Sequence, residues 1–335
     1  MRILVTGGAG YVGSTTTQRL LEAGHQVTVY DSLLRGYRAA VPVAAKLVVG
    51  DIGDGPLFER TLRDDGIEAV LHCAGLALVG ESVADPRSYF AANVVSGLAM
   101  LDAMRAAGVT RIAFSSSAAV YGEPQQVPIV ENHPLRPVNP YGETKRAFEG
   151  MLDWYTRAYD MAAVSLRYFN VCGATDERGE DHRPETHLIP NILGAVAGGT
   201  PLKVFGTDYP TPDGTCIRDY IHVDDLADAH AAGLALTAEI KARHVCCNLG
   251  SGSGFSVREV LSAAESVVGQ PVPHTVADRR AGDPPVLVAS NERARELLGW
   301  QPRRGVLSEM IGSAWRWRES HPQGYGASTK LTDEA

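Results

Sequence analysis

The chain has 335 residues, of which 44% are hydrophobic and 21% are charged, and its formal net charge is −8. These proportions are ordinary for a globular enzyme, and the length favours two domains over one. The acidic balance argues against nucleic acid or an anionic membrane surface as the main partner.

The five cysteines lack the spacing of a disulfide framework, which favours a reducing compartment. No apolar run approaches the ~20 residues that a membrane span needs. The N-terminus, MRILVTGG, enters an apolar strand at once and lacks the long apolar region of a signal peptide. We therefore expect a cytoplasmic protein.

In the first half of the chain, short apolar runs rich in β-branched residues alternate with stretches of helical period. The runs predict strands at Ile3–Val5, Gln26–Tyr30, Lys46–Val49, Ala69–Cys73, Ile112–Ser115 and Ala163–Tyr168. The intervening helices include Ser14–Ala23, Asp85–Ala107 and Tyr141–Asp160. This alternation predicts an α/β fold with a Rossmann-type doubly wound parallel sheet, whose strands are apolar throughout because both faces are covered.

After Asn170 the pattern changes, and residues 171–218 are rich in Gly, Pro and Asp. A strand and helix return at Tyr220–Thr237, a further strand follows at Val245–Leu249, and a helix is expected to begin at Ser256. We predict a cofactor-binding Rossmann domain of residues 1–170 plus about 219–248. A smaller mixed α/β substrate-binding domain would take residues 171–218 and 249–322, and residues 323–335 would form a C-terminal tail.

A glycine-rich stretch, GGAGYVG, follows the first strand at residues 7–13. Gly7, Gly10 and Gly13 would let the backbone approach a pyrophosphate, and the helix that opens near Tyr11 and Val12 offers unpaired N–H donors. The spacing alone is equally typical of a plain strand-to-helix turn.

An acidic residue after the second strand adds information that the glycines lack. Asp31 lies 21 residues after Gly10, where a carboxylate suits the ribose hydroxyls of NAD and repels the phosphate of NADP. Arg35 lies close by and would offset part of this preference. Asp51 and Ile52, after the third strand, are expected to lie beside an adenine ring. We predict NAD as the cofactor.

The segment NPYGETKR, residues 139–146, carries the catalytic chemistry that we predict. With Asn139 as cap and Pro140 in the first turn, Tyr141 and Lys145 project from one helix face. A phenol of pKa ~10 becomes a base near neutrality only if its pKa falls by roughly 3 units. The ammonium group of Lys145, together with oxidised nicotinamide, would provide this shift. Ser117, at the end of the fifth strand, would relay a proton from a substrate hydroxyl to Tyr141.

These motifs together resemble the extended short-chain dehydrogenase/reductase family, and in particular its UDP-glucose 4-epimerase branch. The resemblance rests on GGAGYVG, SSSAAVYG and PYGETK, and on AGLALVGES (74–82), LRYFNVCGA (166–174), DYPTPDGTCIRDYIHVDDLADAH (208–230), NLGSGSG (248–254), RRAGD (279–283) and HPQGY (321–325). It runs from Met1 to about Tyr325.

The resemblance implies reversible C4 epimerisation of UDP-galactose and UDP-glucose through a 4-keto sugar, with transient reduction of NAD. Tyr141, Lys145 and Ser117 would be catalytic. The residues that the resemblance places near NAD are Gly7, Gly10, Tyr11, Val12, Gly13, Asp31, Ser32, Leu33, Arg35, Gly36, Asp51, Ile52, Cys73, Ala74, Gly75, Leu76, Ala77, Asn93, Ser115, Tyr141, Lys145 and Phe169. Those near the UDP-sugar are Ser117, Tyr141, Asn170, His187, Leu188, Val204, Phe205, Arg218, Arg280, Asp283 and Leu287. A homodimer through the long helices is also implied.

Three positions depart from the family pattern or vary within it. Ala77 replaces a lysine that many members have, which predicts weaker retention of NAD. His187 stands where some members have Asn, and either side chain can donate to a phosphate. Leu287 is intermediate between the aromatic residue of members restricted to plain hexoses and the small residue of members that also accept N-acetylated sugars. Activity on UDP-N-acetylglucosamine is therefore an alternative.

Other functions fit less well. A nucleotide-sugar dehydratase would need acidic residues where this chain has Ala118 and Ala119. A non-catalytic NAD sensor would be expected to lack Tyr141 or Lys145. We predict no metal site, because Cys246 and Cys247 point to opposite faces of a strand and nothing completes a ligand set around the histidines of DHRPETH, residues 181–187. His222 and the pair Asp224–Asp225 are interpreted as folding and helix-capping residues.

Overall fold

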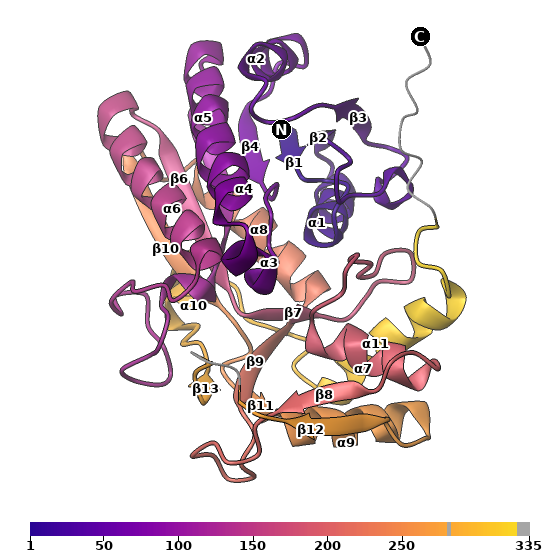
Figure 1. Cartoon of the computed structure of the whole chain (residues 1–335). Coiled ribbons are helices and arrows are strands. Elements are labelled where there is room, and N and C mark those ends of the chain that lie inside the picture. Colours follow the sequence, from indigo (N-terminus) through magenta and orange to yellow (C-terminus); the bar gives the residue numbers. More distant parts are fainter. Residues whose placement is uncertain (280–282, 327–335) are drawn as a thin grey trace.

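The computed structural model describes residues 1–279 and 283–326, which are built around a seven-stranded parallel sheet (Figure 1). Its strands run in the order β10-β6-β5-β4-β1-β2-β3, and every neighbouring pair is parallel. The strands are β1 (Arg2–Thr6), β2 (Gln26–Asp31), β3 (Lys46–Val49), β4 (Ala69–His72), β5 (Arg111–Ser117), β6 (Ala162–Tyr168) and β10 (Arg243–Leu249). The strand order reverses between β1 and β4, as in doubly wound folds, and the predicted fold class is confirmed.

Helices cover both faces of this sheet, and successive residues of β1 show which helices cover which face. Leu4 packs with side chains of α2 (Gly55–Asp64), α5 (Ser96–Ala107) and α6 (Pro140–Tyr159). Ile3 and Val5 pack on the opposite side, with α1 (Tyr11–Glu22) and α8 (Val223–Leu236). Because both faces are buried, the strands need apolar residues at every position, which is the pattern that the sequence shows.

The helix predicted at Asp85–Ala107 is confirmed, with a π-helical turn in its course. After α3 (Val79–Ala84) the chain forms α4 (Pro86–Phe90), then the π-helical turn η2 (Ala91–Val95), and then α5 without a break. Asn93 lies in this wider turn and is 6% exposed. The sequence pattern predicted the helix but not the π-helical turn.

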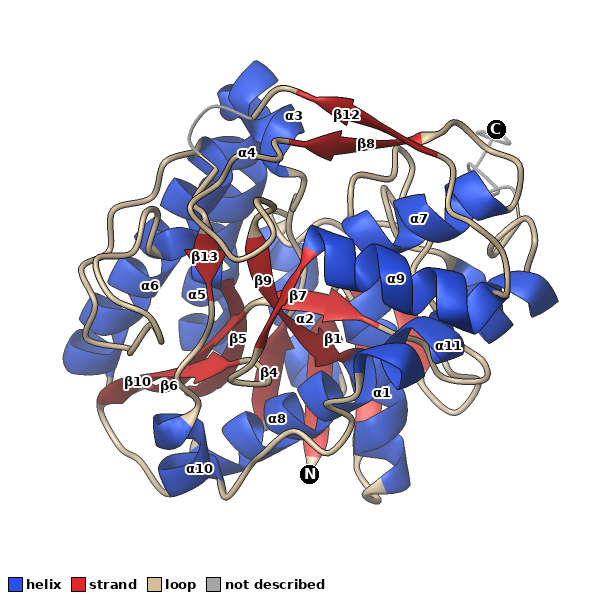
Figure 2. Ribbon diagram, turned by 90° about the horizontal axis from the view of Figure 1, so that it is seen from below, coloured by secondary structure: helices blue, strands red, loops and turns tan. Residues whose placement is uncertain are grey.

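The second half of the chain builds a smaller mixed unit, which lies below the sheet in Figure 1 and whose strands β8 and β12 lie at the top of the view in Figure 2. Strand β9 (Ile217–His222) pairs in parallel with β7 (Asn170–Cys172) and β13 (Val286–Leu287) and antiparallel with β11 (Gly254–Ser256). A separate parallel pair joins β8 (Leu202–Phe205) to β12 (His274–Ala277). Helices α7 (Leu188–Val196), α9 (Val257–Val268) and α11 (Leu307–Ser320) enclose a second apolar core with these strands. Short turns η1 (Arg38–Ala40), η3 (Ala118–Val120) and helix α10 (Glu292–Leu298) complete the described elements.

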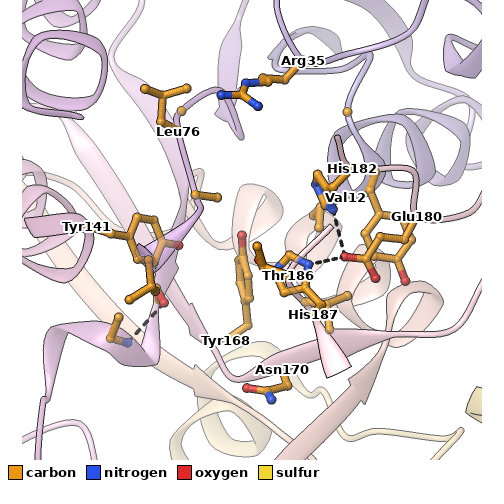
Figure 3. Close-up of a pocket in the computed structure, with 18 of the residues that line it drawn as sticks. Val12, Arg35, Leu76, Tyr141, Tyr168, Asn170, Glu180, His182, Thr186 and His187 are labelled. Carbon is orange, nitrogen blue, oxygen red and sulfur yellow. Dashed lines mark hydrogen bonds and ion pairs between the residues drawn. The ribbon is translucent and has the colours of Figure 1, made fainter. Parts of the chain in front are cut away.

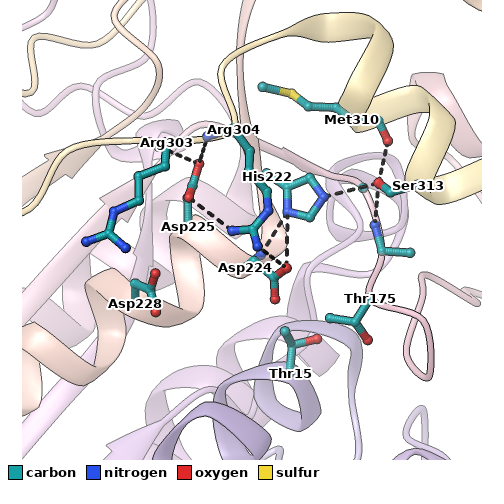
Figure 4. Close-up of polar contacts among 12 residues, drawn as sticks. Thr15, Thr175, His222, Asp224, Asp225, Asp228, Arg303, Arg304, Met310 and Ser313 are labelled. Atoms are coloured by element: carbon teal, nitrogen blue, oxygen red, sulfur yellow. Dashed lines mark hydrogen bonds and ion pairs between the residues drawn. The ribbon is translucent and has the colours of Figure 1, made fainter.

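Local capping at the start of α8 and α9 agrees with the sequence. The His222 ring accepts a hydrogen bond from the backbone N–H of Asp224 at 3.1 Å, and the Asp225 carboxylate accepts from the N–H groups of Arg303 and Arg304 (Figure 4). Ser256 and Glu259 cap the first turn of α9 reciprocally. The structural roles predicted for His222 and Asp225, and the helix start at Ser256, are confirmed.

Some residues after the predicted domain boundary at 249 pack against helices and strands of the large parallel sheet. Ala294 of α10 and Trp300 pack with Leu226 of α8 and Val245 of β10, and the Trp300 indole donates to the carbonyl oxygen of Asp225 at 2.8 Å. The two parts of the chain therefore interlock. Among the helices of residues 1–279 and 283–326, none is both long and apolar enough to cross a membrane.

Candidate active site

A large cavity of about 920 Å³ lies at the carboxyl ends of the parallel strands, between the sheet and the smaller unit. This is the edge at which doubly wound folds bind ligands. The volume is at the upper end of the range for one drug-sized ligand, so the cavity has room for an extended dinucleotide-sized molecule with part of a second ligand. Figure 3 shows Tyr141 and Tyr168 on one side of it, and Glu180, His182 and His187 on the other.

The glycine-rich stretch makes a close strand-to-helix turn at one end of the cavity. Gly7 has a φ of +69°, and a Cβ there would lie 2.6 Å from the backbone nitrogen of Ala74. A Cβ at Gly13 would overlap the carbonyl oxygen of Gly7. Gly10, the cap residue of α1, has no side chain to occupy the free N–H groups of the first turn, which contains no acidic residue. These features leave the helix N-terminus ready for an anion such as a pyrophosphate.

Asp31 lies at the end of β2 and is held in place by the loop around it. Its carboxylate accepts hydrogen bonds from the backbone N–H of Ala9 at 2.9 Å and of Leu33 at 2.8 Å. Burial raises the pKa of Asp31, and these two hydrogen bonds counteract that shift. The remaining acceptor capacity of the carboxylate suits ribose hydroxyls.

Arg35 does not face Asp31 in this structure. Its guanidinium pairs with Glu81 at 2.6 Å and donates to the carbonyl oxygen of Arg183 at 2.9 Å. The positive charge of Arg35 is therefore already paired with a carboxylate. Arg35 consequently does less than we expected to offset the preference of Asp31 for NAD over NADP.

Asn93 does not line the cavity itself but supports a loop that does. Its side chain accepts from the N–H of Leu76 at 2.8 Å, donates to the carbonyl oxygen of Leu76 at 3.0 Å, and donates to Thr144 at 3.0 Å. The buried amide thus fixes the 74–77 loop, which lines the cavity, against α6. Asn93 is a positioning residue.

The three predicted catalytic residues meet at the junction of β5 and α6. Asn139 caps α6 through the N–H of Gly142 at 2.8 Å, and Pro140 opens the helix as predicted. The Tyr141 phenol lies near the Ser117 hydroxyl, which acts to lower the pKa of the phenol. The Ser117 hydroxyl oxygen also accepts from the N–H of Ala119 at 3.1 Å, which leaves its hydrogen for the phenol or a substrate.

Lys145 lies behind Tyr141 and does not line the cavity. Its ammonium group donates to the carbonyl oxygen of Ser115 at 2.8 Å and is 5.8 Å from the centre of the Tyr141 ring. Burial lowers the pKa of Lys145 to about 8, while Cys73 and Glu149 act in the opposite direction. At that value roughly nine tenths of the amine is protonated at pH 7.

The expected decrease in the pKa of Tyr141 does not occur in the protein alone. Burial raises its pKa, and the neighbouring Ser117 hydroxyl offsets this only in part. The decrease was expected from Lys145 together with oxidised nicotinamide, and the Lys145 ammonium, 5.8 Å from the ring centre, does not by itself outweigh the burial of the phenol. The role of Lys145 with the cofactor bound stays a prediction. Ionisation of Tyr141 requires a further positive charge beside it.

The smaller unit contributes the other wall. Of the residues predicted near the UDP-sugar, those that line the cavity are Ser117, Tyr141, Asn170, His187, Leu188, Val204, Phe205, Arg218, Asp283 and Leu287. Arg218 forms an ion pair with Asp283 and donates to the carbonyl oxygen of Ile217 at 2.7 Å. A diphosphate that binds Arg218 must therefore compete with Asp283. Arg280 lies outside the described residues.

His187 is surrounded by carboxylates. Its Nδ1 atom lies 2.7 Å from Glu180 and 2.9 Å from Glu185, and His182 joins the same group at 3.0 Å from Glu180. Burial disfavours the charged rings, but the carboxylates outweigh it and raise the pKa of His182 to about 9 and of His187 to about 10. The statement that nothing completes a ligand set around DHRPETH was wrong, because the loop folds Glu180 and Glu185 onto both histidines.

The sequence therefore predicted most of the residues that line the cavity. A few predicted residues do not line it, and a few residues that line it were not predicted. Leu33, Asn93, Ser115 and Lys145 are adjacent to the cavity without lining it, and the other described residues predicted near NAD line it. Residues that line the cavity and were not predicted include Tyr37, Tyr168, Glu180, His182 and Tyr325. The sequence analysis predicts Tyr168 only as part of a strand. It lies at the end of β6, next to Ser117 on β5, and its place at a strand end is the signal that indicates a cavity residue.

Comparison with known proteins identifies the class. The family model for NAD dependent epimerase/dehydratase proteins matches residues 3–247. The chain belongs to this NAD dependent epimerase/dehydratase family.

Within the family, the similarity extends to one enzyme along nearly the whole chain. The UDP-glucose 4-epimerase of Streptomyces lividans is 50% identical over 326 residues, which are 97% of this chain and 98% of that protein. The crystal structure of UDP-glucose 4-epimerase from Brucella ovis in complex with NAD is 44% identical, with a TM-score of 0.91 over 94% of this chain and 97% of that one. The enzyme from Bifidobacterium longum, in complex with NAD+ and UDP, is 37% identical with a TM-score of 0.91 over 97% and 100% of the two chains.

Proposed function

We propose that this site interconverts UDP-galactose and UDP-glucose at C4, with Tyr141, Ser117 and Lys145 as its catalytic residues. The activity is supported by the near full-length similarity to UDP-glucose 4-epimerases. The observation that carries the residue assignment is the junction of β5 and α6, where the Tyr141 phenol and the Ser117 hydroxyl lie together at the cavity wall.

The residues present fit NAD. The turn at Gly7, Gly10 and Gly13 would hold the pyrophosphate, Asp31 would accept from a ribose hydroxyl, and Ile52 would pack on the adenine. When bound, NAD supplies a hydride acceptor and donor for C4 and a positive charge at the oxidised nicotinamide. The chain supplies the rest of the chemistry.

Proton transfer is assigned to Tyr141 and Ser117. Ser117 binds the 4-hydroxyl of the sugar and relays its proton, and Tyr141 accepts that proton in one direction and returns it in the other. Lys145, fixed by the carbonyl oxygen of Ser115, keeps a positive charge behind the phenol that favours its ionised form. A dehydratase is not supported, because positions 118 and 119 of the cavity wall carry only methyl groups.

The sugar nucleotide is assigned to the wall of the smaller unit. Val204 and Phe205 of β8 would contact the uracil end, and Arg218 would bind the diphosphate, displacing Asp283. A planar guanidinium is suited to phosphate oxygens. Leu287 lines the cavity and would limit the space for an N-acetyl group, so the alternative activity on the N-acetylated pair is not favoured.

The experiment that tests this function is a conversion assay. Purified protein is incubated with UDP-galactose, with and without added NAD, and UDP-glucose is measured by chromatography. Wild-type protein is expected to convert the sugar without net NADH, and Tyr141→Phe to lose about 100- to 10,000-fold in rate while retaining NAD. No conversion by wild-type protein that holds NAD would reject the assignment.

A homodimer belongs to the same proposal. The flank formed by α4 to α6 carries several exposed large apolar side chains: Phe90, Val95, Leu98, Trp154 and Tyr159. Trp154 is 69% exposed, and α5 and α6 lie side by side on this flank in Figure 1. Such a patch favours association. Sedimentation of wild type and Trp154→Glu would test it, since a monomeric wild type contradicts the dimer.

We also place the protein in the cytoplasm, with no nucleic acid or membrane as a partner. Its five cysteines are free thiols, and the net charge is −8. Both properties support this placement.

A further inference from the structure

The four-residue group beside the cavity has the donor set of a transition-metal site. Glu180, His182, Glu185 and His187 each offer one ligand atom, and these atoms lie within 4.8 Å of one another. Four of these separations, each between a ring nitrogen and a carboxylate oxygen, are 2.7, 2.9, 3.0 and 3.8 Å, and the 2.9 and 3.8 Å contacts are made by different oxygens of Glu185. A tetrahedron with bonds of about 2.1 Å, as zinc forms with imidazole and carboxylate, has edges of about 3.4 Å. The four nitrogen-to-oxygen separations lie on both sides of that length.

Pairwise hydrogen bonding satisfies this arrangement poorly. A ring nitrogen carries at most one hydrogen, yet Nδ1 of His187 faces oxygens of both Glu180 and Glu185. One oxygen of Glu180 in turn faces both rings, as the dashed lines in Figure 3 show. A single cation at the centre would bind all four atoms at once and would neutralise both carboxylates.

Further contacts orient the Glu185 carboxylate and hold the part of the loop around Glu180. The backbone N–H groups of Thr186 and His187 donate to Glu185 at 2.7 and 2.8 Å, which orients its carboxylate. Upstream, Arg178 donates to the carbonyl oxygen of Ala40 at 3.0 Å. Asp181 accepts from the N–H of Tyr325 at 3.0 Å. Metal sites depend on such supporting contacts.

The two carboxylates of the group are more buried than its two histidines, which are partly exposed. The Glu180 side chain is 8% exposed and that of Glu185 is 20% exposed, whereas His182 and His187 are 31% and 43% exposed at the cavity wall. An ion can therefore enter from the cavity. Two nitrogen ligands argue against calcium and magnesium, which prefer oxygen throughout, and favour zinc or a related ion.

We propose that Glu180, His182, Glu185 and His187 bind one divalent transition-metal ion, zinc by preference. The site is structural, because the protein fills all four positions of a tetrahedral ion and leaves none for a substrate. The ion fixes the loop 178–187, which precedes α7 and lines the same cavity as Tyr11 and Val12 of the cofactor turn.

The test measures metal binding directly, without NAD or sugar, so its outcome is independent of the epimerase activity. The full chain is treated with a chelator, exchanged into metal-free buffer and titrated with Zn²⁺ alone by calorimetry. Co²⁺ is added in parallel, since its visible absorption reports four-coordinate geometry. The variants are Glu180→Gln and His182→Asn. Glu177→Gln, which removes a 73% exposed carboxylate just before this loop, is the matched control.

Wild type and Glu177→Gln are expected to bind one ion per chain, with a raised unfolding temperature and a tetrahedral Co²⁺ spectrum. Glu180→Gln and His182→Asn are expected to bind about 100-fold more weakly or not at all. If either fails to fold by circular dichroism, Glu185→Gln replaces it, because its amide oxygen still accepts from the N–H groups of Thr186 and His187. The absence of stoichiometric binding to wild type, or equal binding to the ligand variants, overturns the proposal.

Discussion

The ion pair beneath the catalytic helix gives the most quantitative prediction. Glu149 lies on the same face of α6 as Tyr141 and Lys145, two turns from Tyr141, and pairs with Arg167 of β6 at 2.6 Å. The two side chains are 4% and 5% exposed. Burial disfavours the guanidinium charge, but hydrogen bonds from Arg167 to Glu149 hold its pKa above the ordinary value. Ser116 donates to the same carboxylate at 2.6 Å.

Glu149→Gln leaves the Arg167 charge buried without its counter-ion. Loss of one partner of such a pair costs about 3–5 kcal/mol, which is a large part of a typical stability of roughly 5–15 kcal/mol. At about 2 °C per kcal/mol for a long chain, the unfolding temperature is expected to fall by about 6–10 °C. Glu143→Gln is the matched control, because Glu143 and Arg146 form an exposed pair on the same helix that is worth less than about 1 kcal/mol.

Thermal unfolding followed by circular dichroism measures these differences. The double variant Glu149→Met with Arg167→Met removes both charges and is expected to be more stable than Glu149→Gln. The carboxylate also raises the pKa of Lys145, so the alkaline decline of turnover in Glu149→Gln should move to lower pH. If Glu149→Gln unfolds at the same temperature as Glu143→Gln, the argument from burial is refuted.

Three further predictions concern specificity, cofactor retention and pH. Leu287→Tyr should lower the rate on UDP-N-acetylgalactosamine relative to UDP-galactose, because the larger ring fills the cavity wall; an unchanged ratio of the two rates would contradict this role. Ala77→Lys should raise the NAD content of the purified protein by restoring a cation at the cofactor side, and unchanged occupancy would reject the idea. Burial lowers the pKa of His230 to about 4. Between pH 6.5 and 4 the unfolded state therefore binds a proton that the folded state does not. The stability that this neutral histidine contributes is complete above pH 6.5 and is lost as the pH falls toward 4. In urea unfolding over this range, His230→Gln should reduce the dependence on pH by about one proton, whereas an identical slope would show that His230 does not titrate there.

Several features could be predicted from the sequence because they depend on short-range spacing. The strands are continuous apolar runs, since parallel strands are buried on both faces. The glycine turn and the Asn139–Pro140 helix start depend on backbone preferences of a few neighbouring residues. Tyr141 and Lys145 share a helix face because four residues make about one turn. These elements set the position of the cavity, since the carboxyl ends of parallel strands meet at one edge.

Other features exist only because distant segments pack together. The raised pKa of Tyr141 follows from burial, which no local pattern reports. Arg35 lines the cavity but its charge is paired with Glu81, and Asn93 turns inward through a π-helical turn. The carboxylates of Glu180 and Glu185 meet two histidines because contacts with Ala40 and Tyr325 shape their loop. Spacing along the chain determined which groups are available, whereas desolvation and long-range contacts decided their charge and orientation.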